Sequence, residues 1–201
     1  MTEDEARAWI FARFGSKGGE RVAAFLDLVV DENRRQNLIA PSTVATIWVR
    51  HALDSAQLMN WDRVGAWLDI GTGGGFPGMV SGLLRSQPVV LVEPRRKRAD
   101  FLAQCVDKLD ARHITVSATD VEKVDVKSAV ITARAVAPVE KLLRIAAHCA
   151  TSTTRWVLPR GSSLDEATLS IARQRFAMFH VEQSKSDPTS NVIILEGARP
   201  A

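Results

Sequence analysis

The sequence predicts an α/β protein in which a seven-stranded, mostly parallel sheet follows an N-terminal helical extension. Two observations lead to this prediction. From Ala66 onward, short runs of β-forming residues alternate with amphipathic helical segments, which is typical of an open parallel sheet covered on both faces. Near the C-terminus, two such runs follow each other with no helix between them, so we expect an antiparallel pair that completes the sheet.

Residues 1–60 are predicted to form a helical extension packed on the core. Apolar residues between positions 22 and 29 repeat at helical spacing, and a polar stretch at 31–37 then interrupts the pattern. Pro41 and Ser42 provide a start signal for a second apolar stripe. The first repeat consists of Val22, Phe25, Leu26 and Val29.

The second stripe contains His51, for which the default interpretation is a core histidine satisfied by a neighbour. Arg50 and Asp54 lie on either side of it. Because these two residues are four positions apart on a predicted helix, their default interpretation is a surface ion pair.

Residues 61–201 are predicted to form the sheet domain as a single structural unit. The five parallel strands are expected at 66–70, 89–93, 113–117, 128–132 and 155–159. The helices between them are expected near 77–86, 97–109 and 138–150. A capping box at Ser163–Glu166 opens a further helix that runs to about Arg175. The last two strands are expected at 177–181 and 191–195.

The stretch from Trp67 to Gly78 is the most informative part of the chain. An apolar run ends in an acid and a glycine-rich turn, and Pro77 then marks the start of a helix. This layout brings backbone N–H groups and a helix N-terminus against a nucleotide-like ligand. The glycines fit two patterns: G-x-G-x-G from Gly71, common in S-adenosylmethionine sites, and the dinucleotide pattern G-x-G-x-x-G from Gly73.

Two features favour the first pattern. Gly71 directly follows the strand, as the tight turn requires. Asp69 lies near the strand's end, where a buried carboxylate is costly unless it accepts hydrogen bonds from the loop or faces a cationic group. We therefore expect a site for S-adenosylmethionine that involves Asp69 and the glycines of the first pattern, which are Gly71, Gly73 and Gly75.

Other strand ends carry further candidate residues. Glu93 ends the second strand, where a carboxylate commonly binds the ribose diol of a nucleoside, although a nicotinamide enzyme would use it similarly. The loop after the third strand is expected beside the adenine and contains Asp120, Val121 and Glu122. Arg134 leaves the fourth strand at the sheet's carboxyl edge, where an arginine suits phosphate or carboxylate.

A run of four cations begins the helix after Glu93. Because cations at a helix N-terminus oppose the macrodipole, local stability does not explain them, whereas contact with phosphate would. The alternative is a solvated face. The run consists of Arg95, Arg96, Lys97 and Arg98.

Composition limits the partners and the compartment. The net charge is +3, and the isoelectric point near 9.1 permits a polyanionic partner without proving one. Cys105 and Cys149 match no metal-ligand spacing, so we expect buried thiols and no metal. The acidic N-terminus does not resemble a signal peptide, and no apolar run is long enough to cross a membrane. We expect a cytoplasmic protein.

Together these residues resemble the RsmG (GidB) family, the bacterial 16S rRNA guanine-N7 methyltransferases. The resemblance covers roughly residues 33–161, and Arg160-Gly161 stands where family members often have Lys-Gly. Its specific part is the combination of Arg-His-x-x-Asp-Ser, the glycine loop ending in Pro-Gly, and a later Ala-Arg-Ala. The matching segments are Asn37-Leu38, Arg50–Ser55, Leu68–Gly78, Glu93, Arg98, Phe101-Leu102 and Thr132–Ala135.

The resemblance implies a Rossmann-like class I fold that binds S-adenosylmethionine and releases S-adenosylhomocysteine. It implies that Gly71, Phe76, Val121, Glu122 and Arg134 contact the cofactor. The implied acceptor is N7 of one guanine in the decoding-region loop of 16S rRNA. The expected partner is the 30S subunit or its precursor, with the protein acting as a monomer.

Guanine N7 carries an in-plane lone pair and no proton, so methyl transfer needs no general base and we name none. Positioning is assigned to His51, Asp54 and Arg134. RNA contacts are assigned to Arg50, Arg95, Arg96, Lys97, Arg98 and Arg160. Two alternatives remain open from the sequence: a nicotinamide-dependent oxidoreductase, and a non-catalytic rRNA-binding assembly protein on a methyltransferase fold.

Overall fold

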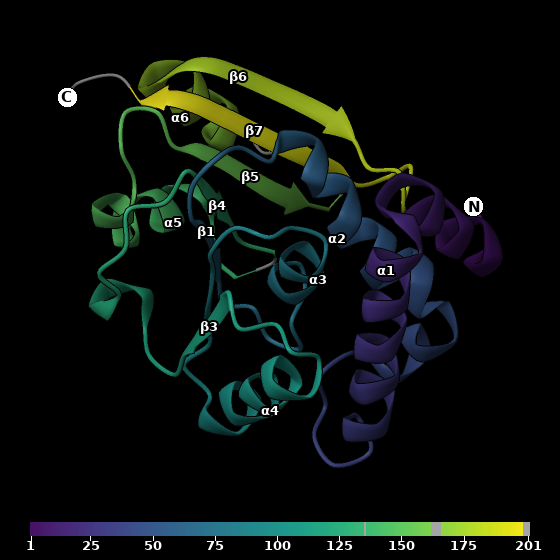
Figure 1. The fold of residues 1–201 in the computed structure, drawn as a ribbon. Helices are drawn as coiled ribbons and strands as arrows, with labels where there is room; N and C mark the ends of the chain where they lie inside the picture. The colour runs from purple at the N-terminus through teal and green to yellow at the C-terminus, as the bar shows by residue number, and fades with distance from the viewer. Residues whose placement is uncertain (135, 162–165, 199–201) are drawn as a thin grey trace.

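The structure is a computed structural model that describes residues 1–134, 136–161 and 166–198. Its centre is a seven-stranded sheet in the order β3-β2-β1-β4-β5-β7-β6 (Figure 1). The first five strands are parallel, and β7 lies antiparallel to both β5 and β6. The strands are β1 Trp67–Ile70, β2 Val89–Val92, β3 Ile114–Ser117, β4 Val130–Thr132, β5 Arg155–Arg160, β6 Phe176–Gln183 and β7 Asn191–Ala198.

These strands confirm the predicted sheet, including its antiparallel C-terminal pair. The parallel strands read as apolar runs because both faces are covered, and successive side chains enter opposite cores. In β2, for example, Val89 and Leu91 join the core on the side of the N-terminal helix, whereas Val92 joins the core on the other side. The first of these cores is the larger and includes residues from both sides of position 60.

Helices cover both faces of the sheet. On one face lie α1 Glu3–Glu32, α3 Gly78–Leu83 and α4 Arg96–Lys108, and on the other lie α5 Val139–Ile145 and α6 Glu166–Arg175 (Figure 1). Short turns η4 Val121–Lys123 and η5 Ala147–Cys149 complete the second face. The helix predicted from the capping box is present from Glu166 to Arg175, and Ser163 lies outside the described residues.

The N-terminal region departs from a simple series of helices. A capping box formed by Thr2 and Glu5 starts α1, which is kinked where Gly15 adopts a φ of 74°. Residues 41–61 then form short pieces: η1 Pro41–Thr46, the π-helical η2 Trp48–Leu53, α2 Asp54–Ala56 and η3 Gln57–Trp61. The division of the chain at residue 60 stays a prediction.

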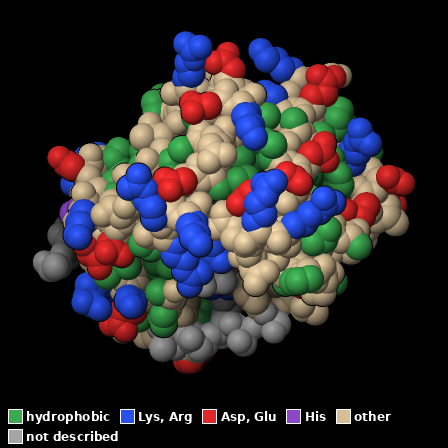
Figure 2. Space-filling model, turned by 90° about the horizontal axis from the view of Figure 1, so that it is seen from below, with side chains coloured by type: hydrophobic (Ala, Val, Ile, Leu, Met, Phe, Trp, Pro, Cys, Tyr) green, Lys and Arg blue, Asp and Glu red, His purple; other side chains and the backbone are tan. Residues whose placement is uncertain are grey.

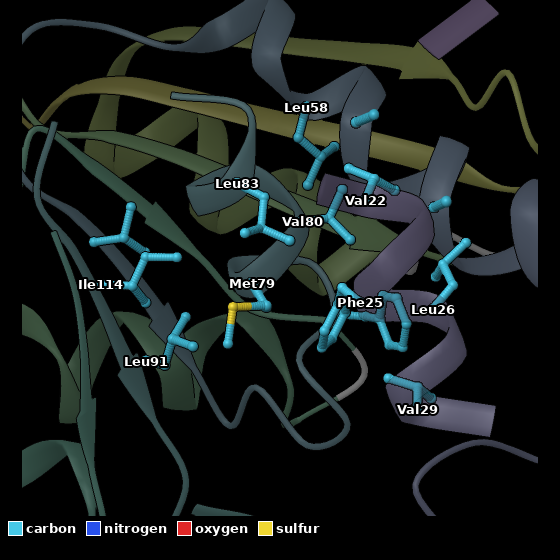
Figure 3. Packing of buried hydrophobic residues seen from close by; sticks show 14 of the residues in the cluster. Val22, Phe25, Leu26, Val29, Leu58, Met79, Val80, Leu83, Leu91 and Ile114 are labelled. Carbon is cyan, nitrogen blue, oxygen red and sulfur yellow. The ribbon is translucent and has the colours of Figure 1, made fainter. Parts of the chain in front are cut away.

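The second half of α1 is held against the sheet domain by its apolar stripe. Figure 3 shows Val22, Phe25, Leu26 and Val29 of α1 in one cluster with Met79, Val80 and Leu83 of α3. Residues Leu91 of β2 and Ile114 of β3 close this cluster from the sheet side. The predicted helical repeat at 22–29 is therefore a core-facing stripe, and it brings α1 next to the glycine-rich turn.

Other single-residue predictions have clear outcomes. Cys105 and Cys149 are both free and buried, as predicted. The predicted ion pair between Arg50 and Asp54 is wrong, because Arg50 pairs with Asp187 and Asp54 pairs with Arg134. The π-helical winding of η2 separates the two side chains from the spacing that an α-helix would give them.

We expect Gly78→Ala to destabilise the protein by about 1–3 kcal/mol or more, because an added Cβ would overlap Leu91 Cδ2 and lie 2.5 Å from Asp69 Cβ. Urea unfolding would measure the loss. Gly161→Ala is the control, because a Cβ at Gly161 would meet no atom of the described residues within 4 Å. Equal stability of Gly78→Ala and wild type would contradict the packing described at the start of α3.

Candidate functional site

The glycine-rich turn between β1 and α3 has the backbone geometry that glycine permits. Gly71, Gly73 and Gly75 have φ values of 64°, 60° and 96°. A Cβ on Gly71 would lie 2.8 Å from Val136 Cγ2, whereas a Cβ on Gly75 would lie 2.6 Å from Phe25 Cζ. Gly71 therefore allows close approach from the loop after β4, and Gly75 allows packing against α1.

Asp69 supports this turn from below. It is fully buried, its Oδ2 accepts from the Gly78 N–H at 2.9 Å, and its Oδ1 accepts from the Thr132 hydroxyl at 2.6 Å. The same hydroxyl oxygen accepts from Trp67 Nε1 at 2.9 Å. The predicted hydrogen bond to the glycine loop is present. Both oxygens of Asp69 accept hydrogen bonds within the protein, and Asp69 is not part of the lining of the cavity above the turn, so its direct contact with a cofactor stays a prediction.

Burial raises the pKa of Asp69 from 3.8 to about 6, and the hydrogen bonds from Thr132 and Gly78 offset part of that rise. The carboxyl group therefore ionises close to neutral pH. These two donors stabilise the ionised carboxylate. A change in the turn that moved the Gly78 N–H away would therefore raise the free-energy cost of burying the charge.

Glu93 holds the other side of the turn. It is 4% exposed, its Oε2 accepts from the Gly73 N–H at 2.9 Å, and its Oε1 accepts from the Arg95 N–H at 2.9 Å. One carboxylate thus connects the end of β2, the glycine loop and the start of α4. Unlike Asp69, Glu93 lines the cavity and keeps further lone pairs for a ligand.

The first cavity has a volume of about 480 Å³ and lies above the turn. Of the predicted cofactor residues, it brings together Gly71, Gly73, Phe76, Glu93 and Arg134. Gly75 is not part of this lining, because its Cα faces the core residues Phe25, Leu102 and Met79. Among the described residues, Asp120, Val121 and Glu122 are not part of its lining, so their contact with a cofactor stays a prediction. The remaining walls are Leu38, Ile39, Ala40, His51, Thr72, Gly74, Pro94, Arg95, Arg98 and Val136.

His51 and Arg134 form one wall of this cavity. Arg134 donates from Nη2 to His51 Nδ1 at 3.2 Å, so His51 carries its proton on Nε2 and donates to Thr43 Oγ1 at 2.8 Å. Thr43 in turn donates to the carbonyl of Ala40 at 2.8 Å. The Phe76 ring packs against the imidazole with a centroid distance of 4.9 Å and lies 5.5 Å from the Arg134 guanidinium carbon.

Burial lowers the pKa of His51 from 6.5 to about 4, and the positive charge of Arg134 adds to this effect. His51 is therefore neutral at physiological pH and serves as a hydrogen-bond acceptor for Arg134. The default interpretation of a satisfied, buried histidine is confirmed. His51 also lies in the cavity wall, and the positioning role assigned to it from the sequence stays a prediction.

Asp54 fixes Arg134 from the other direction. Its Oδ2 accepts from Arg134 Nη1 at 3.0 Å, and its Oδ1 accepts from the Ser186 hydroxyl at 2.7 Å. Ser186 belongs to the turn between β6 and β7. The three predicted positioning residues, His51, Asp54 and Arg134, are thus brought together in one hydrogen-bonded group that also includes the C-terminal hairpin.

The second cavity, of about 340 Å³, shares His51 and Arg134 with the first. Of the predicted RNA contacts, it contains Arg50 and Arg160. Spacing and periodicity contained no signal for four of its polar residues, because these come from the β6–β7 turn and the start of β7: Ser186, Asp187, Ser190 and Asn191. Its remaining lining consists of Thr43, Asp54, Pro159, Gly161, Ser186, Asp187, Ser190 and Asn191.

The cation run at the start of α4 is divided between two surroundings. Arg95 and Arg98 line the first cavity, and Arg98 also donates to the carbonyl of Asn37 at 2.8 Å. Arg96 is exposed and pairs with Asp100 at 2.9 Å, and Lys97 is exposed. Gln36 and Asn37 lie beside all four cations along a groove of about 340 Å³.

The described residues provide neither a metal site nor a membrane-spanning helix. Over residues 1–134, 136–161 and 166–198, no group of three or more His, Cys, Asp or Glu side chains is placed to hold a metal ion. Within the same ranges, the helices lack the length and apolar character needed to cross a membrane.

Comparisons with known proteins agree with this geometry. Residues 19–191 match the family model described as GidB: rRNA small subunit methyltransferase G. The chain is 40% identical to the ribosomal RNA small subunit methyltransferase G of Erythrobacter litoralis over 98% of this chain and 97% of that protein. It is 41% identical to the protein of that name from Novosphingobium aromaticivorans over 100% of this chain and 92% of that protein.

Solved structures show the same fold at low sequence identity. A methyltransferase from Geobacter sulfurreducens superposes with a TM-score of 0.63 and 11% identity, covering 86% of this chain and 88% of that one. A predicted O-methyltransferase from Agrobacterium tumefaciens superposes with a TM-score of 0.60 and 20% identity, covering 74% and 82% of the two chains. The predicted Rossmann-like methyltransferase fold is confirmed.

We expect Asp69→Asn to change how stability depends on pH. Because the pKa of Asp69 is raised to about 6, its stabilising contribution is full below about pH 4 and is lost as the pH rises through 6. The stability of the variant relative to wild type should therefore increase between pH 4 and 7, by up to about 3 kcal/mol. Urea unfolding at several pH values tests this, with Asp4→Asn, at an exposed position of α1, as the control.

His51→Gln should have the opposite effect. The lowered pKa of His51 gives stability above pH 6.5 that is lost as the pH falls towards 4, because only the unfolded chain binds the proton readily. The variant should lose less stability than wild type on acidification over this range, and His180→Gln, at an exposed position of β6, should behave as wild type. Parallel curves for wild type and His51→Gln would show that His51 titrates normally.

Proposed function

The chain belongs to the GidB family of ribosomal RNA small subunit methyltransferases G, and we propose that it transfers a methyl group from S-adenosylmethionine to N7 of one guanine in 16S rRNA. The observation that carries this proposal is the pair of cavities that share His51 and Arg134. One cavity has the features of a nucleoside-cofactor site, and the other opens beside it. A nicotinamide-dependent oxidoreductase is not supported, because the family and the solved structures are methyltransferases.

The residues of the first cavity fit S-adenosylmethionine. Gly71 lines this cavity with a φ of 64°, a conformation that glycine adopts readily, so bare backbone rather than a side chain forms this part of the wall. Glu93 lies at the end of β2, with carboxylate lone pairs suited to a ribose diol. The volume of about 480 Å³ lies within the ~300–1,000 Å³ typical of small-ligand sites. Gly71, Gly73, Phe76, Glu93 and Arg134 would hold the cofactor.

When bound, S-adenosylmethionine supplies an activated methyl group on a sulfonium centre. Because guanine N7 has no proton to remove, the protein has only to align N7 with the methyl group and to accommodate the charge that moves from the sulfonium centre to the base. Arg134 is held in one orientation by Asp54 and by neutral His51, at the wall shared by both cavities. This arrangement supports a positioning role for these three residues, with no side chain acting as a general base.

The cations around the site suit RNA phosphates. Arg95, Arg96 and Lys97 are exposed at the start of α4, next to the turn that follows α1. Figure 2 views the molecule from below, the side on which α4 and this turn lie in Figure 1, and shows lysine and arginine side chains interspersed with acids rather than one uniform positive patch. We therefore assign phosphate contacts to individual cations, namely the α4 run, Arg50 and Arg160.

The 30S subunit or its precursor is the proposed partner, with the enzyme acting as a monomer in the cytoplasm. A protein of this size presents few base-reading groups, so the folded RNA has to supply much of the selectivity. The extension over residues 1–60 and the domain over residues 61–201 would then meet the RNA together, because both contribute walls to the two cavities.

The test is transfer of labelled methyl from S-adenosylmethionine to 30S subunits that lack the modification, followed by nucleoside analysis. We expect label in 7-methylguanosine. Gly71→Val should abolish S-adenosylhomocysteine binding and transfer, because Gly71 has a φ of 64° and its Cβ would overlap Val136. Calorimetry measures the binding.

Label in any other nucleoside would contradict the assignment to N7. Tight S-adenosylhomocysteine binding by Gly71→Val would show that the glycine turn is not part of the cofactor site. If wild type binds S-adenosylhomocysteine but leaves 30S subunits unlabelled, the methyl acceptor is not ribosomal RNA.

A further inference from the structure

The second cavity is built from parts of the chain that are far apart in sequence. Thr43, Arg50, His51 and Asp54 come from the segment before β1, Arg134 follows β4, and the other walls come from the end of β5 and the β6–β7 turn. His51 and Arg134 line both this cavity and the one proposed for the cofactor, so the two cavities are neighbours. A group bound here would therefore lie next to the donor, beside these two side chains.

Hydrogen bonds hold the β6–β7 turn against the segment before β1. The Lys185 N–H donates to Gln57 Oε1 at 2.8 Å, the Ser186 hydroxyl donates to Asp54 Oδ1 at 2.7 Å, and Arg50 pairs with Asp187 at 2.8 Å. These contacts connect residues that are more than 120 positions apart. The cavity is thus preformed by the fold rather than left to a loose loop.

The two acids in the cavity are already committed to the protein. Both oxygens of Asp187 accept from neighbours in the turn or from Arg50, and the hydrogen bonds to Thr189 and the contact with Arg50 lower the pKa of Asp187 well below its usual range. Asp54 is shared between Arg134 and Ser186. Neither acid is therefore the main group available to a ligand.

Asn191 differs from these acids. It is the first residue of β7 and the register partner of Arg160 in β5, so the two side chains project from the same face of the sheet. Asn191 lines the cavity, and among the described residues its side-chain amide makes no hydrogen bond to another group. An amide offers both a donor and an acceptor, which suits the edge of a nucleobase.

We propose that the second cavity receives the target guanine after it has been turned out of the RNA stack, and that Asn191 contacts the polar edge of the base. This inference rests on the proposed function. At about 340 Å³ the cavity suits one small group and not a duplex, and enzymes that modify a base commonly extrude it into such a pocket. With N7 facing the cofactor cavity, the N1–H and the amino group of guanine point the other way, towards the remaining polar lining.

Arg160 completes the arrangement. As the partner of Asn191 across β5 and β7, it lies beside the base-contacting amide, where its charge suits the phosphate attached to the extruded nucleotide. In this arrangement the Asn191 amide contacts the base, and the Arg160 guanidinium contacts the RNA backbone.

The test combines a blocking variant with a contact variant. Gly161→Phe should fill the cavity, because Gly161 lines it and a Cβ there would meet none of the described atoms within 4 Å. We expect it to lower kcat/KM for 30S methylation more than 100-fold and to leave the Kd for S-adenosylhomocysteine within twofold. Asn191→Ala should lower kcat/KM about 10- to 100-fold, also with unchanged S-adenosylhomocysteine binding. Met178→Phe, on exposed β6, should match wild type.

Other outcomes would overturn the proposal. Gly161→Phe that methylates 30S subunits within threefold of wild type shows that the base enters elsewhere. Parallel loss of S-adenosylhomocysteine binding and methylation shows that the second cavity belongs to the cofactor site. If Gly161→Phe has a lowered melting temperature, Asn191→Ala decides, and unchanged kcat/KM in that variant rejects the contact. Failure of the proposed function is distinct, because wild type itself would then place no label on guanine N7.

Discussion

The buried carboxylate of Asp69 is the interaction on which the site depends. It joins three elements, because it lies on β1 and accepts hydrogen bonds from the first residue of α3 and the last residue of β4. The glycine turn is closed at that α3 end, and Arg134 leaves β4 two residues beyond Thr132. Sheet, turn and positioning arginine are therefore held in one geometry by a charge that no solvent reaches.

Most of the fold was predictable because its signals are local. The strands appear as apolar runs separated by glycine, proline and polar turns, and all seven lie within a few residues of the predicted positions. The segment 41–61 was less predictable. Its winding changes from 3₁₀ to π to α over a few residues, and this is determined by packing under α1 and by contacts with the β6–β7 turn rather than by periodicity.

The candidate site was predictable where motif and topology act together. Strand ends meet at one edge of a parallel sheet, so Gly71, Glu93 and Arg134 could be placed near one another from sequence, and the structure brings them to one cavity. The direction of a side chain was not predictable. Asp69 faces the turn and not the cavity, and Asn191 enters the second cavity only because a hairpin from the C-terminal end folds back over residues 50–57.

The two cavities also differ in when a growing chain can complete them. The described residues that line the first cavity all precede residue 137, whereas those of the second cavity extend to Asn191. Because synthesis proceeds from the N-terminus, the described walls of the first cavity are all made before those of the second. The C-terminal hairpin thus completes only the second cavity, and a chain that ends before β7 would have the described lining residues of the first cavity but would lack Asn191 of the second.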